Sequence, residues 1–125
     1  MAQRFAGKPY LIAFWSVECP HCQGELELFA KLLREQPSLP LVLVAVDAPA
    51  LAPQVAERLI ELHLSDADNW QFAEARAERL RFVVDRQWRG ELPRNYLFDA
   101  KHRAQTASGA ISEDMLRRWL AMHLD

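Results

Sequence analysis

The 125-residue sequence has only two cysteines and four glycines, and it contains no long hydrophobic run. Two cysteines are too few for a small scaffold held together by several disulfides. No apolar stretch approaches the roughly 18 residues that a membrane-spanning helix needs. Seven scattered prolines and the lack of repeats argue against linkers and disorder. We therefore expect one compact domain over residues 1–125, without a membrane span.

An excess of charge of one sign is also missing, because 15 basic and 17 acidic residues give a net charge of −2. This balance gives no electrostatic reason to expect nucleic acid or an anionic membrane as a partner. The residues after Met1 do not form the basic and then apolar segment of a secretory signal. Two possibilities stay open, a cytosolic protein and a mature domain without its leader.

The first half of the chain predicts alternating strands and helices. Residues 9–15 and 39–47 are continuous apolar runs typical of strands buried on both faces. Apolar residues at helical spacing predict helices over 20–35 and 53–64. The side chains expected on the buried faces of these helices are Cys22, Leu26, Phe29, Leu33, Val55, Leu59, Ile60 and Leu62.

The pattern between residues 65 and 91 is less regular. Residues 74–88 predict an extra helix with Leu80, Val84 and Trp88 on one face. Residues 69–72 fit either a short strand or a loop anchored by its aromatic side chains. We expect the four tryptophans to pack in the core or at its rim.

The end of the chain predicts a hairpin followed by a helix. Residues 92–99 and 103–111 are expected to form antiparallel strands around a short turn. Ser112 is a suitable N-cap for the last helix, whose buried side is expected to carry Met115, Leu116, Trp119 and Leu120. The element order predicts an α/β fold with a mixed central sheet flanked by helices, its first two strands being parallel.

Cys19 and Cys22 are separated only by Pro20 and His21. A disulfide closing so short a loop restrains the unfolded chain little, so reactivity explains the pair better than stapling does. The start of a helix favours a thiolate, and cysteines in Cys-X-X-Cys have pKa values lowered to about 3.5–7.5. The spacing predicts that Cys19 is the exposed nucleophile and that Cys22, turned inward, resolves the mixed disulfide.

Two neighbours of the cysteine pair are candidates for tuning its chemistry. His21 could stabilise a Cys19 thiolate by its charge or its N–H group, which would make the disulfide a stronger oxidant. The alternative is a solvent-facing histidine. Glu25, about one helical turn after Cys22, could accept or relay the proton when Cys22 attacks. The alternative is a glutamate on the helix surface.

Residues 14–22 (FWSVECPHC) and 91–99 (ELPRNYLFD), in this element order, resemble the thioredoxin fold. The resemblance is closest to the bacterial TlpA/ResA-like thiol–disulfide oxidoreductases. It implies a three-layer sandwich with an extra helical segment before the strand that Pro93 opens. It also implies a cis peptide bond at Pro93, facing the active-site disulfide, with the Leu92 backbone placed to pair with a substrate strand. Glu25 matches the acid that this group commonly has three residues after the second cysteine.

The tetrapeptide Cys-Pro-His-Cys resembles that of DsbA-type oxidants, although the large helical insertion of that family is missing. The catalytic residues that the sequence predicts are Cys19, Pro20, His21, Cys22 and Glu25. Those predicted to meet the substrate are Trp15, Leu92, Pro93 and Arg94. Arg89 and Arg94 flank the proline loop and could face an acidic partner.

The resemblance implies exchange of the Cys19–Cys22 disulfide with protein thiols, in a direction that the sequence leaves open. It implies protein substrates and a redox partner protein, a monomer, no cofactor beyond the disulfide, and an extracytoplasmic compartment such as the periplasm. One alternative is a copper or zinc carrier, but the cysteine pair with His21 supplies three ligands where structural zinc takes four. Another is a non-catalytic interaction domain, against which both cysteines and Pro93 argue.

Overall fold

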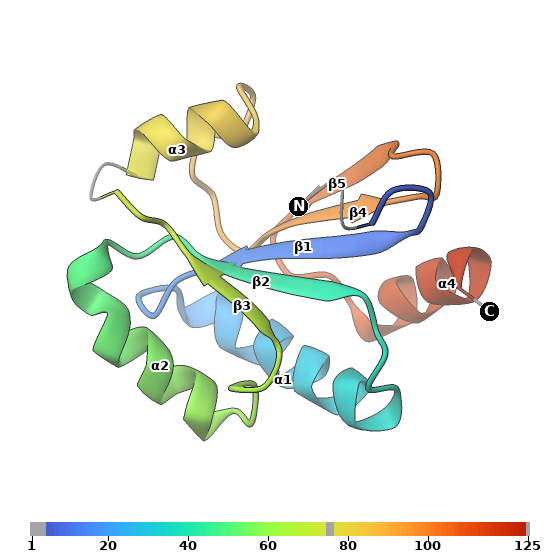
Figure 1. Ribbon diagram of the computed structural model, residues 1–125, viewed down its shortest axis with the longest axis horizontal. Coiled ribbons are helices and arrows are strands. Elements are labelled where there is room, and N and C mark those ends of the chain that lie inside the picture. The colour runs from blue at the N-terminus through green and yellow to red at the C-terminus, as the bar shows by residue number, and fades with distance from the viewer. Residues whose placement is uncertain (1–4, 75–76, 125) are drawn as a thin grey trace.

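The computed structural model describes residues 5–74 and 77–124, which form a mixed five-stranded sheet with helices on both faces (Figure 1). The strands are β1 (Tyr10–Trp15), β2 (Leu41–Ala45), β3 (Asp68–Gln71), β4 (Arg94–Phe98) and β5 (Ala104–Ser108). The helices are α1 (Pro20–Glu35), the short 3-10 helix η1 (Pro49–Leu51), α2 (Ala52–Glu61), α3 (Ala77–Val84) and α4 (Glu113–His123). In this part of the chain no helix has both the length and the apolar character needed to cross a bilayer.

The strand order is β3-β2-β1-β4-β5, which puts β1 at the centre of the sheet. β1 pairs with β2 in parallel and with β4 in the antiparallel sense. β3 extends the parallel side and β5 extends the antiparallel side. Since parallel neighbours need a crossover, α1 connects β1 to β2, as the sequence predicts. The chain therefore enters α1 from the end of the central strand.

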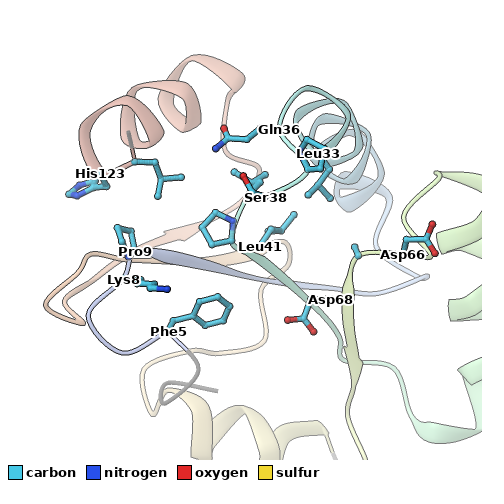
Figure 2. A pocket seen from close by; sticks show the side chains of 15 residues that line it. Phe5, Lys8, Pro9, Leu33, Gln36, Ser38, Leu41, Asp66, Asp68 and His123 are labelled. Atoms are coloured by element: carbon cyan, nitrogen blue, oxygen red, sulfur yellow. The ribbon is translucent and has the colours of Figure 1, made fainter.

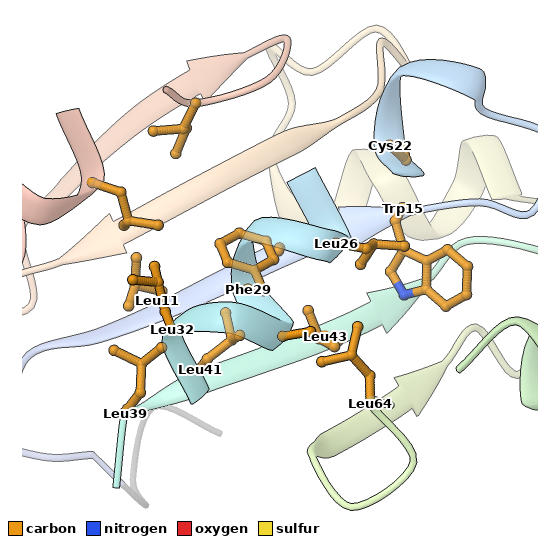
Figure 3. Close-up of a cluster of buried hydrophobic side chains, with 14 of the residues drawn as sticks. Leu11, Trp15, Cys22, Leu26, Phe29, Leu32, Leu39, Leu41, Leu43 and Leu64 are labelled. Atoms are coloured by element: carbon orange, nitrogen blue, oxygen red, sulfur yellow. The ribbon is translucent and has the colours of Figure 1, made fainter. Parts of the chain in front are cut away.

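Side chains alternate between the two faces of the sheet and build two separate cores. On one face Leu11 and Leu43 pack in a cluster with Phe29 of α1, Leu59 of α2 and Trp119 of α4 (Figure 3). The opposite face carries a smaller, largely aromatic cluster to which α3 contributes Leu80. Its buried members are Phe14, Val42, Val44, Phe72, Trp88 and Tyr96. Three helices thus cover one face of the sheet, and α3 lies on the other (Figure 1).

Most predicted elements are confirmed, and α1 has the expected bounds. Of the two alternatives for residues 69–72, the strand is correct, because this segment lies in or next to β3. The helix predicted over 74–88 is described as a helix only from Ala77 to Val84, and residues 75–76 lie outside the described chain. Its predicted buried face is wrong in part: Val84 is 46% exposed, and Trp88 is buried but follows the helix. A turn after Val84 redirects the chain, with the Trp88 amide donating to Asp85 O.

Three other apolar side chains predicted to be inside are exposed. Ile60 is 64% and Met115 is 45% exposed. Ile60 follows the buried Leu59, and Met115 precedes the buried Leu116. Successive residues are about 100° apart around a helix, so Ile60 and Met115 lie off the face that packs on the sheet. Trp70 is 52% exposed on the edge strand β3, where its ring N–H donates to Asp68 Oδ1.

Candidate active site

The two cysteines lie where the central strand passes into α1. Cys19 is the N-cap of this helix, Pro20 is its first residue, and the Cys19 amide donates to Ser16 O at 3.1 Å. Cys19 and Cys22 form a disulfide with their Cα atoms 5.4 Å apart. Cys22 is 1% exposed and belongs to the large core, whereas Cys19 is partly exposed. This difference agrees with the predicted roles, with Cys19 open to attack.

The loop before Cys19 is fixed by a buried aspartate that sequence reasoning missed. Asp47 follows β2, is 5% exposed, and accepts a hydrogen bond of 2.8 Å from the Ser16 hydroxyl. The Val17 amide lies 3.3 Å from both carboxylate oxygens of Asp47. Ser16 Oγ in turn accepts from the Glu18 amide at 3.1 Å. The available sequence signal was the position of Asp47, a charged residue at the end of the valine-rich apolar run over residues 39–47.

Glu25 is not on the helix surface, so that alternative is wrong. The residue is 5% exposed, and its Oε2 accepts hydrogen bonds from Asn95 Nδ2 at 3.0 Å and from the Ile111 amide at 2.8 Å. Burial raises the pKa of Glu25 above its usual value, and the bonds from Ile111 and Asn95 lower it in part. Asn95 is the second site-forming residue that the sequence did not reveal. A buried carboxyl thus lies one helical turn after Cys22.

The predicted cis peptide bond between Leu92 and Pro93 is present. Pro93 is buried, and its carbonyl accepts a hydrogen bond from the Gly109 amide at 2.8 Å. Leu92 is partly buried and contacts both cores. Leu92 and Cys19 line one surface cavity of about 410 Å³, together with Asp47 and several neighbours. The structure therefore brings the proline loop and the outer cysteine to the same hollow.

Two residues predicted to meet the substrate lie elsewhere. Trp15 is 2% exposed and packs in the same core cluster as Cys22, so it supports the disulfide from inside (Figure 3). Arg94 is 9% exposed, and its guanidinium donates to Asp85 at 2.9 Å, to the Tyr96 hydroxyl at 3.1 Å and to Ser108. Because these partners hold Arg94, it does not face an acidic protein. Arg89 is exposed, as expected.

His21 and Pro20 are both exposed. The side chain of His21 makes no hydrogen bond or ion pair with another residue that the structure describes, and its effect on the cysteines stays a prediction. Within residues 5–74 and 77–124, no group of three or more histidine, cysteine, aspartate or glutamate side chains is arranged to hold a metal ion.

A larger cavity of about 750 Å³ lies away from the cysteines (Figure 2). It is lined by Pro9 and Leu41, at the starts of β1 and β2, and by Gln36 and His123, at the ends of α1 and α4. Since Cys19 follows the end of β1 and precedes the start of α1, this cavity is at the opposite end of the sheet. Neither cysteine lines it.

Solved structures resemble this chain over most of its length, although no family model and no curated protein sequence matches it. A secreted Mycobacterium tuberculosis disulfide oxidoreductase homologous to E. coli DsbE has a TM-score of 0.73 and 21% identity, over 96% of this chain and 85% of that one. A thioredoxin family thiol:disulfide interchange protein from Chlorobium tepidum has a TM-score of 0.77 and 19% identity, over 99% and 85%. StoA from Bacillus subtilis has a TM-score of 0.62 and 22% identity, over 91% and 83%. The chain therefore has the thioredoxin fold.

Proposed function

We propose that the protein is a thiol–disulfide oxidoreductase that exchanges the Cys19–Cys22 disulfide with protein thiols. The observation that carries this proposal is the disulfide at the start of α1, in which Cys19 is partly exposed and lines a cavity together with Leu92. The structural neighbours support it, because their names describe disulfide oxidoreductases and thiol:disulfide interchange proteins. The electrons pass between sulfur atoms, so we propose that no cofactor beyond the disulfide is needed.

In the oxidising direction a substrate thiolate attacks Sγ of Cys19. The Cys19–Cys22 bond breaks, a mixed disulfide forms, and Cys22 leaves as a thiolate that takes up a proton. A second substrate thiolate then attacks the substrate sulfur of the mixed disulfide and releases Cys19. Two electrons have passed to the protein, and the substrate has gained a disulfide. Reduction of a substrate follows the same steps in reverse, with Cys19 as the attacking thiolate.

The start of α1 supports the role of Cys19 as both leaving group and nucleophile. Free N–H groups and the positive end of the helix dipole stabilise a thiolate there. Glu25 would exchange the proton at Cys22, because it lies one helical turn after this cysteine and its raised pKa favours a bound proton at a higher pH than in an exposed glutamate. His21 would add to thiolate stabilisation at Cys19. We propose these roles for Glu25 and His21.

We propose that the substrate segment docks along the Leu92 backbone, beside Pro93, as an added extended strand. Leu92 lines the cavity of Cys19, so a cysteine in that segment would reach the disulfide. The partners would be protein thiols or disulfides and a second redox protein. We propose that the protein acts outside the cytoplasm, because its structural neighbours include a secreted oxidoreductase and an exposed pneumococcal lipoprotein thioredoxin. We also propose that it acts as a monomer.

Trapping of the mixed disulfide tests the proposal. In the reduced Cys22→Ser variant, Cys19 should form a stable adduct with a peptide disulfide, which intact-mass spectrometry detects. The Cys19→Ser variant should give little adduct, because Cys22 is 1% exposed. Adducts of equal yield in both variants, or none in either, would contradict the proposal. Equilibration of the wild type with glutathione then measures the reduction potential of the disulfide, which indicates the direction of electron transfer. A difference of about 30 mV corresponds to about 1.4 kcal/mol for this two-electron couple.

A further inference from the structure

A basic side chain shares the cavity of Cys19 with the acidic residues Glu18 and Asp47. Arg81 belongs to α3, on the face of the sheet opposite α1, and it lines this cavity together with Cys19, Leu92 and Gly90. The residue is partly buried. Sequence reasoning did not single it out, because the helix that carries it is far from the cysteines along the chain.

The guanidinium of Arg81 lies beside the backbone of Gly90. A Cβ atom at Gly90 would lie 2.9 Å from Cζ and 3.0 Å from Nε of Arg81, so a larger residue there would displace the guanidinium from its present position. Gly90 also has φ +93, in the left-handed region where glycine is favoured. The backbone leading to Leu92 therefore leaves room for the flat face of the guanidinium at the cavity wall.

No carboxylate of the described residues pairs with Arg81, although Glu18 and Asp47 line the same cavity. Nε of Arg81 is buried without a hydrogen-bond acceptor, and the side chain forms no ion pair with any residue in 5–74 or 77–124. The carboxylate of Asp47, which lines the same cavity, is used by Ser16 and Val17. Arg94 differs, because Asp85 neutralises it at 2.9 Å. A partly buried guanidinium with unused donors is a site for an anion.

We infer that Arg81 binds a carboxylate of the substrate, so that the protein prefers cysteines with an acidic side chain close by. This inference rests on the proposed function and adds the substrate class to it. The planar guanidinium fork suits a carboxylate, which can accept two hydrogen bonds from it. The Cys19 sulfur is not the anion in the oxidised protein, because it is bonded to Cys22.

The test compares two synthetic peptides, each with one cysteine, that differ only by glutamate or glutamine beside it. Reduction of the Cys19–Cys22 disulfide is followed under excess peptide, and each rate is divided by the peptide's thiolate concentration. Wild type should react about tenfold faster with the acidic peptide, the scale of one charge-assisted hydrogen-bonded pair with partial exposure. Arg81→Gln should remove this preference. Arg79→Gln, which deletes the same charge at an exposed position of α3, should keep it.

Equal rates of the two peptides with wild type would overturn the inference while leaving disulfide exchange intact. Equal slowing of both peptides by Arg81→Gln would also overturn it, since Arg81 would then act on Cys19 and not on the substrate. No reaction with either peptide would overturn the proposed function and this inference together. If circular dichroism shows that Arg81→Gln is not folded, Arg81→Lys is used in its place. The preference of Arg81→Lys for the acidic peptide should be lower than that of wild type, and an unchanged preference would overturn the inference.

Discussion

Glu25 and Asn95, 70 residues apart in the chain, are joined in the interior by a hydrogen bond of 3.0 Å. Glu25 comes from the helix that carries Cys22, and Asn95 from the strand that follows Pro93. Oε2 of Glu25 also accepts a hydrogen bond from the amide of Ile111, which lies just before α4. One buried carboxyl thus ties together three segments that meet behind the disulfide.

We predict that Glu25→Gln gains stability relative to wild type as the pH rises. Burial raises the pKa of Glu25 in the folded protein, so the folded state holds this proton more tightly than the unfolded chain does. Wild type therefore loses stability as the pH climbs from about 4.3, the ordinary glutamate pKa, through the higher folded pKa. Glutamine can still accept both hydrogen bonds and does not titrate.

Urea unfolding at a series of pH values measures this difference. Glu27→Gln, which removes a carboxylate at an exposed position of the same helix, is the matched control. A stability difference between Glu25→Gln and wild type that stays constant with pH would refute the raised pKa. If Glu25 also handles the proton at Cys22, the variant should slow resolution of the mixed disulfide more than its formation.

Reduction of the disulfide should raise tryptophan fluorescence. Trp15 packs in the core cluster that contains Cys22, and a disulfide in contact with an indole quenches its emission (Figure 3). Trp15→Phe should abolish most of the change on adding dithiothreitol. Trp70→Phe is the control, because Trp70 is exposed on β3 and should leave the change intact. A redox-dependent signal that survives Trp15→Phe would assign it to another indole.

Asp85→Asn should weaken the attachment of α3 to the sheet. Oδ2 of Asp85 accepts hydrogen bonds from Arg94 and from the Tyr96 hydroxyl, both at 2.9 Å. We expect a loss of about 1–3 kcal/mol at neutral pH, since a nearly buried guanidinium is left unpaired. Asp114→Asn removes an exposed ion pair and should stay within about 0.5 kcal/mol of wild type.

The loss of stability caused by Asp85→Asn should also become smaller at low pH. Hydrogen bonds, first from the Gln87 amide and next from Tyr96, lower the pKa of Asp85. Its stabilising effect is therefore complete above the ordinary aspartate pKa of about 3.9 and is lost as the pH falls through the lower folded pKa. Unfolding curves that show the same cost at all pH values would contradict this account.

Both tyrosines should ionise at a higher pH in the folded protein than in the unfolded chain. Burial raises the pKa of Tyr96 to about 12, and it also raises the pKa of Tyr10. These are the two tyrosines of the sequence, so tyrosinate absorbance at pH 10 should be lower in the folded protein and rise when urea unfolds the chain. Stability should fall as the pH rises above 10, because the unfolded chain loses these protons first. A normal titration of one tyrosine in the folded protein would be inconsistent with this.

The elements around the cysteines could be predicted because their signals are local. A continuous apolar run, a proline in the first helical turn and apolar residues at helical spacing define β1 and α1 without reference to the rest of the chain. The cis bond before Pro93 was implied only by resemblance. Where the pattern was weak, the prediction failed: Trp88 fits the helical spacing of α3, but a turn at Asp85 decides its position.

The polar partners of the site could not be predicted, since each depends on tertiary pairing. Asn95 faces Glu25 only because β4 lies beside β1, where Asn95 pairs with Ala13. Arg81 and Cys19 line one cavity only because the fold brings α3 to the segment around Gly90 and Leu92. Burial also removes two residues from the predicted substrate surface: Arg94 is enclosed despite its charge, and Trp15 lies in the core, where the tryptophans were expected to pack.

The uneven cover of the sheet has a consequence for motion. The face under α1, α2 and α4 holds the larger core, whereas α3 and the edge strand β5 expose much of their surface. Amide hydrogen exchange should therefore be slowest in β1, β2 and α1 and fastest in α3 and β5. Cys19 belongs to the slowly exchanging half and Arg81 to the fast one, so a bound peptide that bridges them should protect the amides of α3 most.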